Sequence, residues 1–216
     1  MSTSEQILTA MNWRMACRCY DPEKHISDKD WQTILEAARL TPSSFGLEPW
    51  RLLVIENKEL QEKIFEVSRG LPRNADKYVI YLSRRDMTVK GQHVQHMYRD
   101  IFGVEGEALE RREGIFSRFT EGELHGDADT MMAWSIKQDY IMMGTMLTTA
   151  ALMNIDSTPV EGFDSAALHE LLQREGVLDT DEFQIAVMAC FGYRQDDVET
   201  PAKIRQDMHD IVTVVK

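Results

Sequence analysis

The residues best suited to chemistry form three short groups that lie far apart in the sequence. They are the basic segment Arg14-Met15-Ala16-Cys17-Arg18, the turn Pro159-Val160-Glu161-Gly162-Phe163 and the pair Lys203 and Arg205. Guanidinium and ammonium groups bind phosphate oxygens. Glycine lets a backbone N–H come close to a ligand. Taken singly, each group is better explained as ordinary surface, so the evidence must come from their combination.

A fourth feature is the loop Pro42-Ser43-Ser44-Phe45-Gly46-Leu47-Glu48-Pro49-Trp50, which joins a helical pattern to an apolar run. A plain surface connection needs only a few polar residues. The two prolines restrict the backbone, so less conformational entropy is lost when the loop orders around a ligand. We therefore expect this loop to border a binding pocket.

Common catalytic motifs are missing: no GxGxxG follows a predicted strand, and no Walker A, HExxH or GxSxG sequence occurs. His93 and His96 could present two metal ligands on one helical turn, but no third ligand accompanies them. We interpret both as solvent-facing and predict no metal site.

Cys17, Cys19 and Cys190 are too few for a disulfide framework, and we interpret the first two as small buried residues in a reducing compartment.

The composition excludes several classes of partner. The 216 residues carry a formal net charge of −12, which disfavours nucleic acid and anionic membranes as partners. The most apolar segment, 131–154, is interrupted by Lys137 and Asp139 and lacks the roughly 18 apolar residues of a membrane span. No signal peptide is evident at the N-terminus. We expect one cytoplasmic domain over 1–216 with neither kind of partner.

The elements that must position these residues can be predicted from hydrophobic periodicity. The mixed order of helices and strands, without strict βαβ alternation, predicts an α+β fold with helices flanking a sheet. The charged region 86–127 is interpreted as a helical excursion or lid, and the apolar tail 211–215 as a segment that could pair with a partner chain. The predicted helices are 27–41, 58–68, 131–153 and 164–172, and the predicted strands are 51–55, 78–82 and 183–190. The helix 131–153 is apolar nearly all round and should be buried at the centre or at a subunit interface.

Taken in order, the pieces resemble the nitroreductase family of FMN-dependent oxidoreductases from about Met11 to Arg205. Six pieces carry the resemblance: Arg14 to Arg18 with Tyr20-Asp21, the Pro-Ser-Ser loop with Pro49-Trp50, Lys137-Gln138-x-Tyr140 with Gly144, the turn Pro159 to Phe163, Gly192-Tyr193-Arg194, and Lys203-x-Arg205. No single piece is specific to the family, but six pieces in the family's order over almost the whole chain are a specific signal.

The resemblance implies a nitroreductase-like α+β fold, with a central, mostly antiparallel sheet flanked by helices, in an intertwined homodimer. It implies two FMN sites at the subunit interface. NAD(P)H would reduce FMN, and flavin N5 would pass a hydride to a small-molecule electron acceptor in a ping-pong cycle. Nitroaromatics, quinones and activated alkenes are the implied acceptors.

The resemblance also implies roles for individual residues. Arg14, Lys203 and Arg205 match positions that hold the FMN phosphate, and Arg18 matches a basic position at the pyrimidine edge of the flavin. The backbone of Glu161 and Gly162 matches the turn that faces flavin N5. Further implied cofactor contacts are Met15, Ala16, Pro42, Ser43, Ser44, Pro159 and Val160, and implied substrate contacts are Phe45, Phe116 and Phe119, of which Phe116 and Phe119 are equally well explained by packing.

Some residues depart from the family pattern. Ala16 replaces a serine, Leu47-Glu48 replaces Asn-Gln, and no residue of 70–77 clearly matches the Asn and Lys that some relatives place near the flavin. Arg69, Arg73 and Asn74 are candidates for that role. These departures leave three alternatives: a specialised member such as an enone reductase or a supplier of free reduced flavin, a flavin-binding redox sensor or partner protein without efficient turnover, and an acidic interaction domain without a cofactor.

Overall fold

Four antiparallel strands form the central sheet of the computed structural model, which describes all residues from 1 to 216. The strand order is β1-β2-β4-β3, so the last strand pairs with two earlier ones and holds the sheet together. The central pair is long because β2 and β4 are apolar along nearly their whole length. The strands are β1 (Trp50–Val54), β2 (Lys77–Arg84), β3 (Asp156–Val160) and β4 (Phe183–Gly192).

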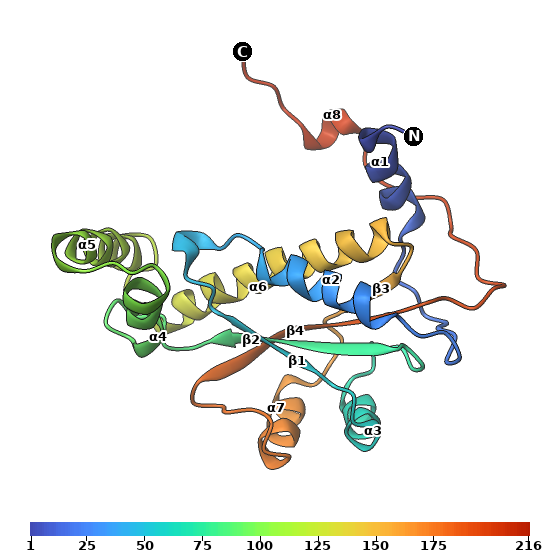
Figure 1. Ribbon diagram of the computed structural model, residues 1–216, viewed down its shortest axis with the longest axis horizontal. Coiled ribbons are helices and arrows are strands. Elements are labelled where there is room, and N and C mark those ends of the chain that lie inside the picture. The colour runs from blue at the N-terminus through green and yellow to red at the C-terminus, as the bar shows by residue number, and fades with distance from the viewer.

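Helices cover both faces of the sheet (Figure 1). Helices α2 (Asp28–Arg39) and α6 (Ala128–Leu152) cover one face, and α3 (Lys58–Val67) and α7 (Ser165–Arg174) cover the other. Alternate residues of β2 enter the two cores: Val79 and Tyr81 pack under α2 and α6, while Ile80 packs under α3 and α7. This two-residue period is the one that a sheet buried on both faces requires.

Helix α6 is the longest element and supports much of the molecule. The Asp127 carboxylate caps its N-terminus by accepting a hydrogen bond from Thr130 N at 2.7 Å. Ten of its residues are buried, which confirms the prediction of a buried apolar helix. Tyr140, Ile141 and Leu152 nevertheless remain exposed. The helix therefore keeps one uncovered strip.

The region 86–127 forms a helical outgrowth at one end of the sheet (Figure 1). It contains α4 (Gln92–His96), the π-helix η2 (Met97–Ile101) and α5 (Gly106–Gly122). A separate cluster of ten buried residues holds it to the start of α6 and to the loop before β1. Its role as a lid stays a prediction.

Some elements differ from the sequence-based expectation. Helix α1 (Thr3–Trp13) was not expected, although Ser2 and Glu5 form a capping box at its start. Strand β3 was read as part of a turn because it contains Pro159, which an edge strand tolerates. The tail contains the short helix α8 (Met208–Ile211), which was not expected, followed by exposed chain, and its pairing with a partner chain stays a prediction.

The expectation that Cys17 and Cys19 are both buried was wrong for Cys19. Cys17 and Cys190 are buried, whereas Cys19 is exposed. The chain forms one isolated bridge from Ala16 to Ser157 of β3 and another from Tyr20 to Arg194, which follows β4, and Cys19 lies between the two bridges. No helix of the protein has the length and apolar character needed to span a bilayer.

Candidate functional site

The basic segment 14–18 lies along the free edge of β3. Ala16 forms a parallel bridge with Ser157, and Thr158 Oγ1 donates a hydrogen bond to the Cys17 carbonyl at 2.6 Å. Because the two segments run in the same direction, Arg14 lies beside the start of β3 and Arg18 beside its end. A segment of this length spans at most about 13 Å. The edge of the sheet thus separates two groups of functional side chains.

The first group is a cluster of cations drawn from both ends of the chain. The Lys203 ammonium donates to the Arg14 carbonyl. Burial, and then the positive charges of Arg14, Arg205 and Arg194, lower the pKa of Lys203. Arg194 is neutralised by Asp156, with Nε 2.9 Å from Oδ2. The other three have no carboxylate partner in a protein with a net charge of −12.

Arg14 adds a second sign that an anion belongs in this cluster. Its Nε is buried and has no hydrogen-bond partner. A buried donor without a partner costs about 1–3 kcal/mol, so proteins rarely keep one without a reason. A phosphate group would offset the mutual repulsion of the three cations, and it would satisfy this donor once the Arg14 side chain turned toward it.

The second group surrounds the turn that follows β3. Arg18 Nη1 donates to the Gly70 carbonyl at 2.6 Å, and Gly70 N donates to the Gly162 carbonyl at 2.9 Å. A Cβ on Gly70 would lie 3.3 Å from Gly162 Cα, so the two glycines allow the two backbones to touch. A cavity of about 420 Å³ opens beside Gly162 and is also lined by Arg69.

The peptide between Glu161 and Gly162 is fixed on several sides. The Glu161 carbonyl accepts a hydrogen bond from Phe163 N at 3.0 Å, and its carboxylate accepts one from Tyr140 Oη at 2.5 Å. Burial, and then the bond to Glu161, raise the pKa of Tyr140 to about 12, so this phenol stays a donor. The Gly162 N–H, in contrast, has no partner within the chain. The turn therefore offers one free backbone donor on a restrained peptide.

The loop 42–50 is ordered by helix α6. Gln138 Oε1 accepts a hydrogen bond from Ser44 N at 2.9 Å, and Ser43 Oγ accepts one from Glu48 N at 2.9 Å. Phe45 and Glu48 have φ angles of 58° and 45°, a region that residues other than glycine seldom adopt. No hydrogen bond joins this loop to segment 14–18 or to Lys203 and Arg205. Within the chain, the loop and the cations are therefore not joined by any hydrogen bond.

The three aromatic residues expected to contact a substrate lie together but differ in exposure. The Phe45 ring lies 5.1 Å from the Phe116 ring and 5.0 Å from the Phe119 ring. Phe116 is fully buried and packs on Trp134, which favours the packing alternative over a substrate contact. Phe45 and Phe119 are half-buried and remain candidates.

His93 also corrects the sequence interpretation. Its Nε2 lies 2.6 Å from the Leu47 carbonyl, and burial lowers its pKa. It is therefore a half-buried structural residue and does not face solvent, whereas exposed His96 pairs with Asp100 at 2.7 Å. Leu47, which departs from the family pattern, is fully buried.

Arg69 and Arg73 are two candidates for the role of the Asn and Lys that some relatives place near the flavin, and their surroundings differ. Arg73 is engaged by Glu62 at 2.6 Å and lies over the Phe65 ring at 4.5 Å. Arg69 has no such partner and lines the cavity beside Gly162. Arg69 is thus the better placed of the two.

Sequence reasoning gave no role to Gly70, Gln138 or Tyr140. Gln138 and Tyr140 belong to the motif Lys137-Gln138-x-Tyr140. The partner of Gln138 is Ser44, 94 residues away, and the partner of Tyr140 is Glu161, 21 residues away. Gly70 carried only the weak signal of a glycine after a helix. Contacts between distant segments are what a single sequence does not reveal.

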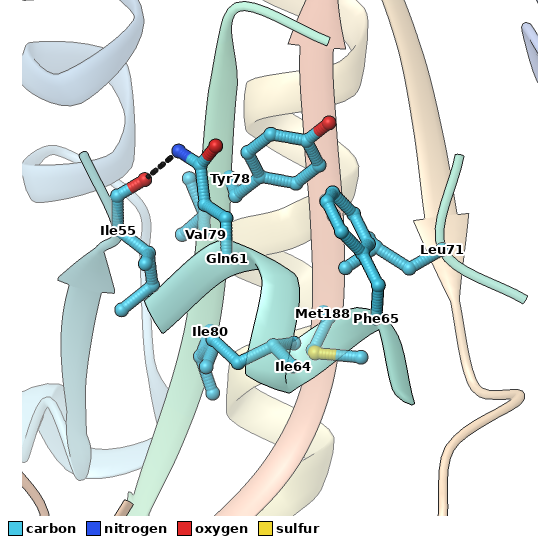
Figure 2. A pocket seen from close by; sticks show the side chains of 10 residues that line it. Ile55, Gln61, Ile64, Phe65, Leu71, Tyr78, Val79, Ile80 and Met188 are labelled. Atoms are coloured by element: carbon cyan, nitrogen blue, oxygen red, sulfur yellow. Dashed lines mark hydrogen bonds between the residues drawn. The ribbon is translucent and has the colours of Figure 1, made fainter. Parts of the chain in front are cut away.

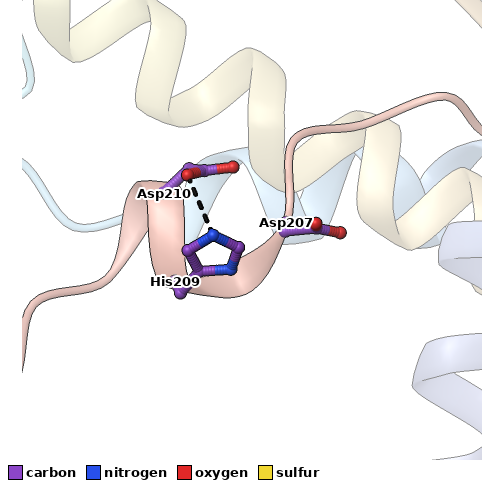
Figure 3. Close-up of side chains that lie close together, drawn as sticks. All are labelled: Asp207, His209 and Asp210. Carbon is purple, nitrogen blue, oxygen red and sulfur yellow. Dashed lines mark ion pairs between the residues drawn. The ribbon is translucent and has the colours of Figure 1, made fainter.

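Two other features do not belong to the site. An apolar cavity between α3 and the sheet measures about 10 Å³, room for about one water, and Gln61 on its wall bonds the Ile55 carbonyl at 2.7 Å (Figure 2). Asp207, His209 and Asp210 cluster on the tail, where His209 pairs with Asp210 at 3.2 Å (Figure 3). All three are exposed, as acidic surface groups often are.

Comparison with known proteins gives consistent matches over the chain. The Nitroreductase family model matches residues 11–193. A Staphylococcus haemolyticus protein, provisionally named NAD(P)H nitroreductase, is 42% identical over 215 residues, covering 98% of each chain. A provisionally named nitroreductase from Bacillus subtilis has the same fold, with a TM-score of 0.81 at 17% identity over 98% of this chain and 100% of that one. Another, from Exiguobacterium sibiricum in complex with FMN, has a TM-score of 0.76 at 17% identity over 100% of this chain and 98% of that one.

Proposed function

Because the chain belongs to the nitroreductase family, we propose that it is an FMN-dependent oxidoreductase that takes electrons from NAD(P)H. The Staphylococcus relative is named for NAD(P)H, and the Exiguobacterium structure contains FMN. One observation in this chain carries the proposal: three cations without carboxylate partners lie at one end of segment 14–18, and a free backbone donor lies near the other. That spacing suits a ligand with a phosphate at one end and a ring at the other.

The residues present fit FMN. Arg14, Lys203 and Arg205 would hold the phosphate, because Arg forms charge-assisted bonds to phosphate and Lys adds a compact charge. Arg18 would face the pyrimidine edge, and the Gly162 N–H would face N5. The segments between them supply the flanking contacts, which are Met15, Ala16, Pro159 and Val160.

When bound, FMN would supply the redox chemistry, accepting a hydride from NAD(P)H and passing it to an electron-poor acceptor. The protein would bind, orient and shield. Both partners would use the same cavity in turn, which gives ping-pong kinetics. Nitroaromatics, quinones and activated alkenes are the proposed acceptors, and Phe45 and Phe119 are the proposed aromatic contacts to them.

We further propose that the working unit is a homodimer. Pro42, Ser43 and Ser44 make no bond to the cation cluster of their own protomer, so they would reach the cofactor of the partner subunit. The exposed strip of α6 and the exposed apolar tail are surfaces that a second copy would cover. Each FMN site would then be completed by two protomers.

The phosphate assignment is tested by Arg14→Ala and Arg205→Ala, with Arg174→Ala as a matched surface control. Each site variant removes a charged hydrogen bond worth about 1.5–3 kcal/mol, so the Kd for FMN should rise about ten-fold or more. The Kd for riboflavin, which lacks the phosphate, should not change. Flavin fluorescence titrations measure both constants, and an equal loss for the two ligands would contradict the assignment.

The redox assignment is tested by anaerobic visible spectra of the FMN-loaded protein. Addition of NADPH or NADH should bleach the flavin, and a quinone or nitroaromatic should restore its colour. The relative rates rank the two donors. A protein that binds FMN but does not bleach would favour the flavin-binding sensor instead.

A further inference from the structure

Helix α6 makes a side-chain contact with the turn that carries the free Gly162 N–H. Tyr140 lies on the exposed strip of the helix, and its hydroxyl reaches the Glu161 carboxylate at 2.5 Å. This is the only hydrogen bond that the Glu161 side chain makes. Glu161 and Gly162 share one peptide unit, so a restraint on the first residue restrains the N–H of the second.

The opposite side of the same turn is held by backbone. The Gly162 carbonyl accepts from Gly70 N at 2.9 Å, and Gly70 is itself held through its carbonyl by Arg18. The backbone contact between the two glycines prevents movement in that direction. The Tyr140 hydroxyl is the only hydrogen-bond donor that ties the Glu161 side chain to α6, and it opposes movement of that side chain away from the helix. The turn thus has one rigid side and one side that depends on a single phenol.

We propose that Tyr140 is a positioning residue for the flavin, holding Glu161 so that the Gly162 N–H points at N5. The proposal rests on the proposed function, because it assigns a role toward FMN. Tyr140 would also neutralise part of the negative charge that Glu161 places beside the flavin. It would not transfer a proton, since ionising it beside a carboxylate is unfavourable.

Two physical consequences can be separated by substitution. Tyr140→Phe removes the hydrogen bond and keeps the ring. Glu161→Gln removes the charge but keeps an oxygen that accepts from Tyr140. The double variant removes both charge and bond, so comparing it with Glu161→Gln isolates positioning from charge. Tyr193→Phe is the matched control, because the Tyr193 hydroxyl makes no hydrogen bond within the chain.

The experiment measures FMN affinity, the midpoint potential and the rate of FMN reduction by NAD(P)H for the five proteins. In Tyr140→Phe, NAD(P)H should reduce the bound FMN about ten-fold more slowly than in the wild type. The midpoint potential of the FMN should shift to a more negative value. The Kd of this variant for FMN should change less than about three-fold, because the phosphate end is untouched. Glu161→Gln should shift the potential the other way. The double variant should be slower than Glu161→Gln, and Tyr193→Phe should match the wild type.

The experiment distinguishes failure of the positioning role from failure of the proposed function. A double variant equal to Glu161→Gln would show that only charge acts, and it would overturn the positioning role. A Tyr140→Phe protein with wild-type rate and potential would overturn the whole inference while leaving the FMN assignment intact. A wild-type protein that binds no FMN would overturn the proposed function itself.

Discussion

At the scale of single residues, Asp139 stands apart from the other carboxylates. It is a fully buried residue of helix α6, and neither of its carboxylate oxygens has a hydrogen-bond partner. Burial raises its pKa to about 7, well above the ordinary value of an aspartate. The contrast is Asp156, equally buried but bound to Arg194. Asp139 therefore weakens the fold whenever it is charged.

This predicts a specific pH dependence of stability. The unfolded chain ionises this carboxyl near pH 4, whereas the folded protein holds the proton up to about pH 7. Stability should therefore fall as pH rises between these values and then level off. Asp139→Asn removes this loss, so it should stabilise the protein by about 3 kcal/mol more at pH 8 than at pH 5.

Urea unfolding of both proteins at the two pH values measures this difference. Asp197→Asn, at an exposed position without an ion pair, is the control and should not alter the pH profile. If the free energy of unfolding changed with pH in the same way for Asp139→Asn and the wild type, the charged Asp139 carboxylate would not weaken the fold.

At the scale of elements, α6 acts as a shared support for two loops. Gln138 holds Ser44 of the loop before β1, and Tyr140 holds Glu161 of the turn after β3. The two side chains leave the helix in different directions, since positions two apart do not face the same side. A shift of this helix would move both loops together.

The support from Gln138 can be tested alone. Gln138→Leu keeps the volume but removes the acceptor for Ser44 N, so stability should fall by about 1 kcal/mol. Hydrogen exchange at Ser44 should become faster, because the strained loop loses its anchor. Gln173→Leu, on the exposed face of α7, is the matched control. Unchanged exchange at Ser44 would mean that the loop holds its shape without α6.

The elements that sequence could predict are those whose pattern is local. The helices 28–39 and 58–67 and the strand 77–84 follow directly from apolar periodicity. Strand β3 could not be recognised, because its Asp, Ser and Pro residues are acceptable only at an edge held by β4. In the site, the motif residues were found by resemblance. The contacts among them, such as Lys203 with Arg14, depend on the tertiary fold, and no short-range signal reveals them.

At the scale of the whole molecule, apolar surface gathers away from the two cores. Ile204, Met208, Ile211, Val214 and Val215 of the tail are all exposed, and in Figure 1 the tail extends beyond the body beside α1. Fully burying such a side chain is worth about 1.5–3 kcal/mol. A second protomer that covered this tail would gain a substantial part of its binding energy from it.

Removing residues 208–216 should therefore weaken the proposed dimer and spare Lys203 and Arg205. The dissociation constant should rise more than about ten-fold, because even two buried side chains exceed 1.4 kcal/mol. Sedimentation of the full and shortened chains over a range of concentrations measures this change. The double variant Val212→Asp with Val214→Asp should behave like the deletion. Equal association of all three proteins would place the interface elsewhere.

The pairing of Arg14 with Lys203 also bears on biosynthesis. The two residues are separated by 189 positions, so at about 5–20 residues per second the ribosome makes the second roughly ten to forty seconds after the first. A nascent chain has its basic segment 14–18 early but lacks the rest of the proposed phosphate site until Lys203 and Arg205 have been made. Capture of FMN would then wait for the second half of the proposed site, and flavin colour would mark chains that had been made beyond Arg205 and folded.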